Sequence, residues 1–137
     1  MSRYISESLR RLVAERASFR CEYCLIPEAN SFYSFQVDHI ISIKHGGKTE
    51  ADNLALACVI CNRNKGSDLG TVLEKSDDII RFFNPRKDQW EDHFEVTEKG
   101  VLNHKTSIGE ATIKIFDLNH PDSILERQVL ISSGKYP

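Results

Sequence analysis

Two pairs of cysteines constrain this 137-residue chain more than any other feature of its sequence. Cys21-x-x-Cys24 and Cys58-x-x-Cys61 supply four thiolates in two pairs, which is the ligand set of a closed, tetrahedral structural zinc site. The first residues lack the apolar core of a signal peptide, so we expect a cytoplasmic protein whose thiols stay reduced and bind metal. Because a closed four-thiolate site has no coordination position for water, this zinc would be structural.

Two other interpretations of the cysteines remain open. They could be four unrelated core residues, or one pair could be a redox site, although neither pair follows the strand-to-helix pattern of a thioredoxin-like motif. The 33 residues between the pairs exceed the roughly 15–20 of a simple zinc ribbon, so a zinc site formed by both pairs would enclose an inserted element.

The segment that begins in this insert contains the residue types needed to cut a phosphodiester bond. Such a cut requires a base, a divalent cation and a cationic hold on the backbone. His39 is the candidate base, because imidazole titrates near neutral pH. Asp38 and Asn62 offer oxygen atoms of the kind that Mg²⁺ prefers. Arg63 and Lys65 follow Asn62 on a predicted helix, so we expect both to contact nucleic acid.

The geometry of this candidate site depends on where the first strand ends. In a regular strand Asp38 and His39 point to opposite faces, so they can serve one phosphate only if the strand ends or bends at His39. The amide of Asn53 is expected to bind backbone groups and to hold the loop after His39. Lys44 and Lys48 flank that loop and are candidates for phosphate contacts, with solvated side chains as the alternative.

Hydrophobic periodicity outlines the remaining elements. It predicts helices over 6–18, about 61–69, 108–118 and 124–130, strands over 34–41 and 54–57, and a hairpin that turns at Lys99-Gly100. Residues 77–84 form a short helical or extended segment that stops before Pro85. The length fits a single domain over 1–137, with a core at about 18–70 and an extension over 71–137.

Charge and hydropathy exclude some classes of protein. A net charge of -2 argues against binding of nucleic acid through bulk positive charge. Residues 1–67 carry nine Lys/Arg against seven Asp/Glu, whereas residues 68–137 carry nine against thirteen, so a basic face would belong to the N-terminal half. No apolar run approaches the roughly 18 residues that span a bilayer, so we expect no membrane association.

The combination Cys-x-x-Cys, Asp-His-Ile, Gly-Gly, Asp-Asn-Leu and Cys-x-x-Cys-Asn-x-x-Lys resembles the HNH endonucleases, whose core is the ββα-metal fold. The resemblance implies His39 as general base, Asn53 as the residue that orders the loop, and Asp38 with Asn62 as ligands of a divalent metal. Asn62 stands where histidine is usual, a known variant in the family, and this favours Mg²⁺ or Mn²⁺ over a tightly bound transition metal. The segment after residue 70 resembles the tail of small stand-alone bacterial HNH proteins.

The predicted fold class is therefore α+β: a ββα-metal core stapled by a four-cysteine zinc site, with an N-terminal helix and a C-terminal α/β extension. The predicted function is metal-dependent hydrolysis of phosphodiester bonds in DNA, with RNA as an alternative substrate and no small-molecule cofactor. A different class of protein remains open, namely a non-catalytic zinc module that binds nucleic acid or a protein partner.

Overall fold

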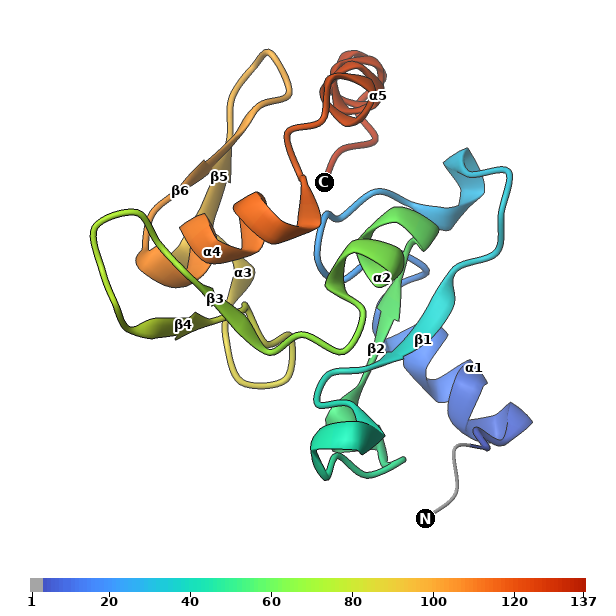
Figure 1. Cartoon of the computed structure of the whole chain (residues 1–137). Helices are drawn as coiled ribbons and strands as arrows, with labels where there is room; N and C mark the ends of the chain where they lie inside the picture. Colours follow the sequence, from blue (N-terminus) through green and yellow to red (C-terminus); the bar gives the residue numbers. More distant parts are fainter. Residues whose placement is uncertain (1–3) are drawn as a thin grey trace. The chain divides into compact units, whose positions relative to one another are not determined.

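The computed structural model describes residues 4–137, which form two compact units that divide between Asp68 and Leu69 (Figure 1). Each unit has its own strands, helices and buried residues, and each is described separately. The prediction that both belong to one domain stays a prediction. No helix among the residues described is both long and apolar enough to cross a membrane.

The first unit is built on one pair of short antiparallel strands. Strand β1 pairs with β2 so that Asp38 lies opposite Ala55 and His39 opposite Leu54. Helix α1 lies against β2, and α2 follows β2 directly and lies against both strands (Figure 1). The elements are α1 (Glu7–Arg16), β1 (Gln36–His39), β2 (Leu54–Ala57) and α2 (Val59–Lys65), with single 3-10 turns at Glu28–Asn30, Ile43–His45 and Ala51–Asn53.

Local capping explains where the two helices of this unit begin and end. The Ser6 hydroxyl accepts a hydrogen bond from the Leu9 amide and starts α1, as the sequence predicts. Helix α2 begins before the predicted position because Cys58 caps it through its sulfur, which accepts from the Cys61 amide. It ends at Lys65 because Gly66 adopts a φ of 53°, which few other residues tolerate.

The second unit consists of two hairpins and three helices. Helix α4 lies against both hairpins and buries one face among them (Figure 1). Phe82 and Phe116 meet edge to face at 5.1 Å, and Phe83 meets Phe94 at 5.5 Å, so the core of this unit is largely aromatic. The elements are β3 (Gly70–Val72), β4 (Ile79–Arg81), α3 (Trp90–His93), β5 (Phe94–Val96), β6 (Leu102–His104), α4 (Ser107–Phe116) and α5 (Pro121–Ser132).

Most sequence expectations for this unit are confirmed, with three differences. Trp90 lies in a short helix rather than in the hairpin strand. Within residues 77–84, β4 takes the extended alternative and pairs with β3, a strand that was not predicted because Gly70 lowers its strand propensity. Helix α5 is longer than predicted, since His120 caps it and Pro121 occupies its first turn, where the missing N–H of proline costs nothing.

Candidate metal centre and active site

The four cysteines converge into one cluster in the first unit. Cys21 and Cys24 come from the turn after α1, whereas Cys58 and Cys61 belong to the first turn of α2. Their sulfur atoms all lie within 4.8 Å of one another, and three of the four residues are buried. Four thiolates at this spacing fit one tetrahedral metal ion, so the interpretation of the cysteines as unrelated core residues is not supported.

Close contact within the cluster shifts the pKa values of three of the four thiols. Hydrogen bonds from Cys21 and its neighbours lower the pKa of Cys58. The same contacts raise the pKa values of Cys24 and Cys61 well above the ordinary range. A metal ion that binds here would displace protons from the thiols of Cys24 and Cys61. Backbone amides of Cys24 and Cys61 already donate to the sulfurs of Cys21 and Cys58.

Asp38 is a buried carboxylate with two donors. It is 5% exposed, and its Oδ2 accepts a hydrogen bond of 2.8 Å from the Tyr23 hydroxyl. The Lys65 ammonium lies 3.2 Å from Oδ2 and 3.3 Å from Oδ1. Burial raises the pKa of Asp38, although Lys65 and Tyr23 both act to lower it. Burial and the nearby carboxylate raise the pKa of Tyr23, which therefore stays a hydrogen-bond donor.

Lys65 occupies a different environment from the predicted one. Only 3% of it is exposed, and its ammonium donates both to Asp38 and to the backbone carbonyl of His39, at 3.0 Å. A side chain in this position faces inward, so the prediction that Lys65 contacts nucleic acid does not fit its location. Its contacts instead fix the end of β1, because it binds two consecutive residues there.

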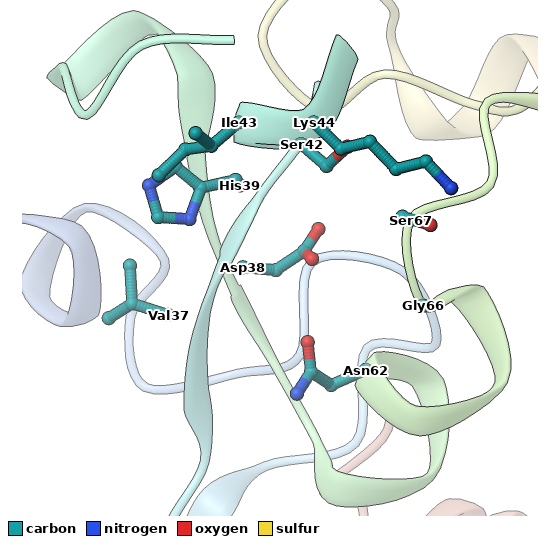
Figure 2. Close-up of a pocket in the computed structure, with 9 residues that line it drawn as sticks. All are labelled: Val37, Asp38, His39, Ser42, Ile43, Lys44, Asn62, Gly66 and Ser67. Carbon is teal, nitrogen blue, oxygen red and sulfur yellow. The ribbon is translucent and has the colours of Figure 1, made fainter. Parts of the chain in front are cut away.

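His39 is the last residue of β1 and is held by a residue that the sequence does not single out. Its Nε2 lies 2.9 Å from the hydroxyl oxygen of Thr49, which follows the Gly46-Gly47 turn. Figure 2 shows the imidazole and the Asp38 carboxylate leaving β1 on opposite sides, as strand geometry requires. The strand ends at His39, and the two side chains diverge at this point, so their convergence on one phosphate stays a prediction.

Asn53 makes the predicted contacts with the backbone. Its amide oxygen accepts from the Ile41 amide at 2.9 Å. Its amide nitrogen donates to the carbonyls of Ile41 and Lys48, at 2.8 and 2.9 Å. Three bonds from one side chain thus close the loop between residues 41 and 48. Gly47 is enclosed by the same contacts, because a Cβ at this position would lie 1.7 Å from the Ile41 carbonyl oxygen.

A pocket of about 390 Å³ lies over the end of β1 and the end of α2. Figure 2 shows Asp38 and Asn62 directed into it from the strand and the helix, and Lys44 extending over its rim. Arg63 and Lys48 are exposed elsewhere on this unit. The pocket is lined by Val37, Asp38, His39, Ser42, Ile43, Lys44, Asn62, Gly66 and Ser67. A carboxylate and an amide oxygen at one opening form a hard, oxygen-based donor set, which suits Mg²⁺ or Mn²⁺.

The histidines and aromatic residues of the second unit do not form a comparable site. Phe94 is 1% exposed and contacts Trp90 with ring centroids at 5.0 Å, so this pair contributes to the core rather than to an exposed stacking platform. His93 lies 2.6 Å from the hydroxyl of Thr106, which caps α4. His104 and His120 are exposed.

Two residues of the first unit were missed by sequence reasoning, namely Tyr23 and Thr49. The position of Tyr23 between two cysteines was a usable signal, because a residue inside a tight metal knuckle is held rigidly. Thr49 offers no such signal, since its contact with His39 depends on the path of the loop.

The first unit is similar in sequence to known proteins. Residues 21–68 match the sequence model of the HNH endonuclease family. The Septu protein PtuA of Bacillus mycoides (strain KBAB4) is 28% identical over 82 residues, a region that makes up 53% of this chain and 12% of that protein. The chain thus spans only a small part of the length of this relative. No solved structure matches the chain.

Proposed function

We propose, from the HNH endonuclease domain that occupies residues 21–68, that this protein is a metal-dependent endonuclease that hydrolyses phosphodiester bonds in DNA. The observation that carries the proposal is the pocket lined together by Asp38, His39 and Asn62. It brings a candidate base and a candidate cation site to one opening at the end of β1. The core around it would be of the ββα-metal type.

His39 is assigned as the general base. Its Nε2 faces the Thr49 hydroxyl, and a neutral imidazole that donates from Nε2 to this oxygen carries its lone pair on Nδ1. In that tautomer Nδ1 can take the proton of the attacking water. Thr49 and the closed loop held by Asn53 would keep the ring oriented for this transfer.

Asp38 and Asn62 are assigned as the protein ligands of Mg²⁺ or Mn²⁺. The cation would neutralise charge on the scissile phosphate and on the leaving oxygen. The Lys65 ammonium supports the ionised form of Asp38, whose burial otherwise favours the protonated acid. Asn53 acts on the loop and does not bind metal.

Arg63, Lys44 and Lys48 are assigned as contacts to the nucleic-acid backbone. All three are exposed on the first unit, and the basic excess of the chain lies in this half. Phosphate contacts of this kind orient the substrate without reading its sequence. Zinc at the four cysteines is assigned a structural role, because four thiolates leave no position for water.

The test is cleavage of supercoiled plasmid by the zinc-loaded protein in Mg²⁺, Mn²⁺ or zinc alone. We expect nicking with Mg²⁺ or Mn²⁺ and none with zinc alone. Asn62→Ala should need roughly 10- to 100-fold more Mg²⁺ for the same rate, the range seen when support of a metal site is lost. Native protein that binds plasmid in a salt-dependent way, but never nicks it, would instead support a non-catalytic zinc module. Cleavage assays on DNA and RNA substrates of matched sequence show which of the two polymers the protein cuts.

A further inference from the structure

The two residues between Cys21 and Cys24 each bind one strand of the central pair. The Glu22 amide donates to the Leu56 carbonyl at 2.8 Å, and its carboxylate accepts from the Leu56 amide at the same distance. Glu22 therefore attaches the cysteine turn to β2. Tyr23 points to the other strand, where its hydroxyl donates to Asp38 at 2.8 Å.

Tyr23 has little freedom to move. Its side chain is completely buried, and it is flanked in the sequence by residues that belong to the metal cluster and to the Glu22 contact. A buried phenol whose backbone is fixed on both sides places its oxygen at one position. The Asp38 carboxylate thus receives a hydrogen bond from a group that the cysteine cluster itself orients.

We propose that Tyr23 is a positioning residue that couples the four-cysteine cluster to the catalytic cation site. It holds Oδ2 of Asp38 and thereby fixes the rotation of the carboxylate beside the pocket, where the Lys65 ammonium contacts both carboxylate oxygens. The inference rests on the proposed function, because it takes Asp38 as a ligand of the catalytic metal. It adds that zinc binding at the cysteines sets the geometry of a second metal site.

The expected loss of Mn²⁺ affinity can be estimated from other metal sites. Partners that hold a ligand by hydrogen bonding typically contribute about 10- to 100-fold in metal affinity. Without the Tyr23 hydroxyl, the carboxylate keeps Lys65 as a partner but loses the contact that is tied to the cysteines. Cation binding should weaken by a factor in this range, whereas the packing of the ring is kept in a phenylalanine.

The experiment compares Tyr23→Phe with the native protein and with Tyr33→Phe, which removes the same hydroxyl from an exposed residue of the same unit. We measure the zinc content and the denaturant unfolding of each protein. Its Mn²⁺ affinity is measured by electron paramagnetic resonance after zinc has been loaded. We expect Tyr23→Phe to keep its zinc and to bind Mn²⁺ about 10- to 100-fold more weakly, with Tyr33→Phe equal to the native protein.

Native Mn²⁺ affinity in Tyr23→Phe would overturn the inference, even if that variant were less stable. If Tyr23→Phe does not retain zinc, Glu22→Ala replaces it, because this change loosens the cysteine turn without touching Asp38. We then expect weaker Mn²⁺ binding than in the native protein, and unchanged binding would overturn the inference. A native protein that binds no Mn²⁺ outside the cysteines would contradict the proposed function itself, so the two failures are distinct.

Discussion

The two units of this protein bury charge in different ways. In the first unit the buried cation Lys65 faces the carboxylate of Asp38 beside a pocket. In the second unit the buried cation Arg127 binds the backbone carbonyls of Gly100 and Leu118, at 2.6 and 2.7 Å. Lys65 also donates to the backbone carbonyl of His39, so both cations hold backbone segments, but only Lys65 also has a buried carboxylate as a partner.

The two units also differ in the composition of their cores. The first unit includes four clustered cysteines, three of them buried. The second has an aromatic core of phenylalanines in edge-to-face contact. We therefore expect the first unit to depend on metal for its fold and the second to depend mainly on apolar burial.

Removal of metal should have the largest effect and should separate the units. Chelation, or Cys58→Ser, is expected to unfold the first unit, because structural zinc contributes roughly 10–16 kcal/mol in small zinc-binding peptides. Hydrogen exchange of the β2 amides reports the first unit. Fluorescence of Trp90, the single tryptophan of the chain, reports the second. Loss of both signals together would show that the units fold as one domain.

Truncation of the aromatic core should affect only the second unit. Phe116 is completely buried against Phe82, so Phe116→Ala should lower the free energy of unfolding by about 3–5 kcal/mol. Denaturant titration followed by Trp90 fluorescence measures this loss. Zinc content and Mn²⁺ binding should stay native, and a fall in either would mean that the site depends on the second unit.

Loss of the Asn53 side chain should loosen the loop beside His39. Asn53→Ala removes three hydrogen bonds to the backbone, and we expect a cost of about 1–3 kcal/mol in local stability. Hydrogen exchange at the Ile41 amide should become faster, because this amide donates to Asn53. Asp52→Ala, a change at the exposed neighbour, serves as the control. Unchanged exchange at Ile41 in Asn53→Ala would show that other contacts close the loop.

The smallest effect concerns an ion pair of the second unit and depends on pH. Hydrogen bonds from Arg81 lower the pKa of Asp88 in the folded state, so its ionised form stabilises the fold above the unfolded pKa. This contribution is lost as pH falls through the folded pKa. Asp88→Asn should cost about 1 kcal/mol or less near neutral pH and nothing in strong acid. Denaturation across pH measures it, and a constant difference would contradict the assignment.

The sequence predicted the components of the site better than their contacts. Spacing was sufficient to gather the cysteines, because two x-x pairs must each form a tight turn around a shared ion. The sequence also identified Asn53 as a side chain that binds backbone groups. The inward position of Lys65 was not predicted, because helical spacing places it on nearly the same face as Asn62 but does not show how deeply that face is buried. The Thr49 contact depends on the closure of a loop, which local sequence does not determine.

The same limit explains the errors in the second unit. The pairing of β3 with β4 joins segments whose own propensities are weak, so tertiary contacts with α4 decide it. By contrast, the apolar residues of 108–118 fit a helix better than a strand, although residues 111–116 also allow a strand, and α4 lies where the helical period predicts. Regular apolar patterns are thus readable from sequence, whereas short strands and polar contacts between distant residues are not.

The most direct test of the central claim is the rate of plasmid nicking by His39→Ala in Mg²⁺ or Mn²⁺. Zinc content and Mn²⁺ affinity are measured on the same preparation, and His104→Ala, an exposed histidine of the second unit, serves as the control. We predict a rate about 10²- to 10⁴-fold below that of the native protein, with both metals still bound, and a native rate for His104→Ala. A native rate of nicking in His39→Ala would contradict the assignment of the general base and, with it, the site proposed for this protein.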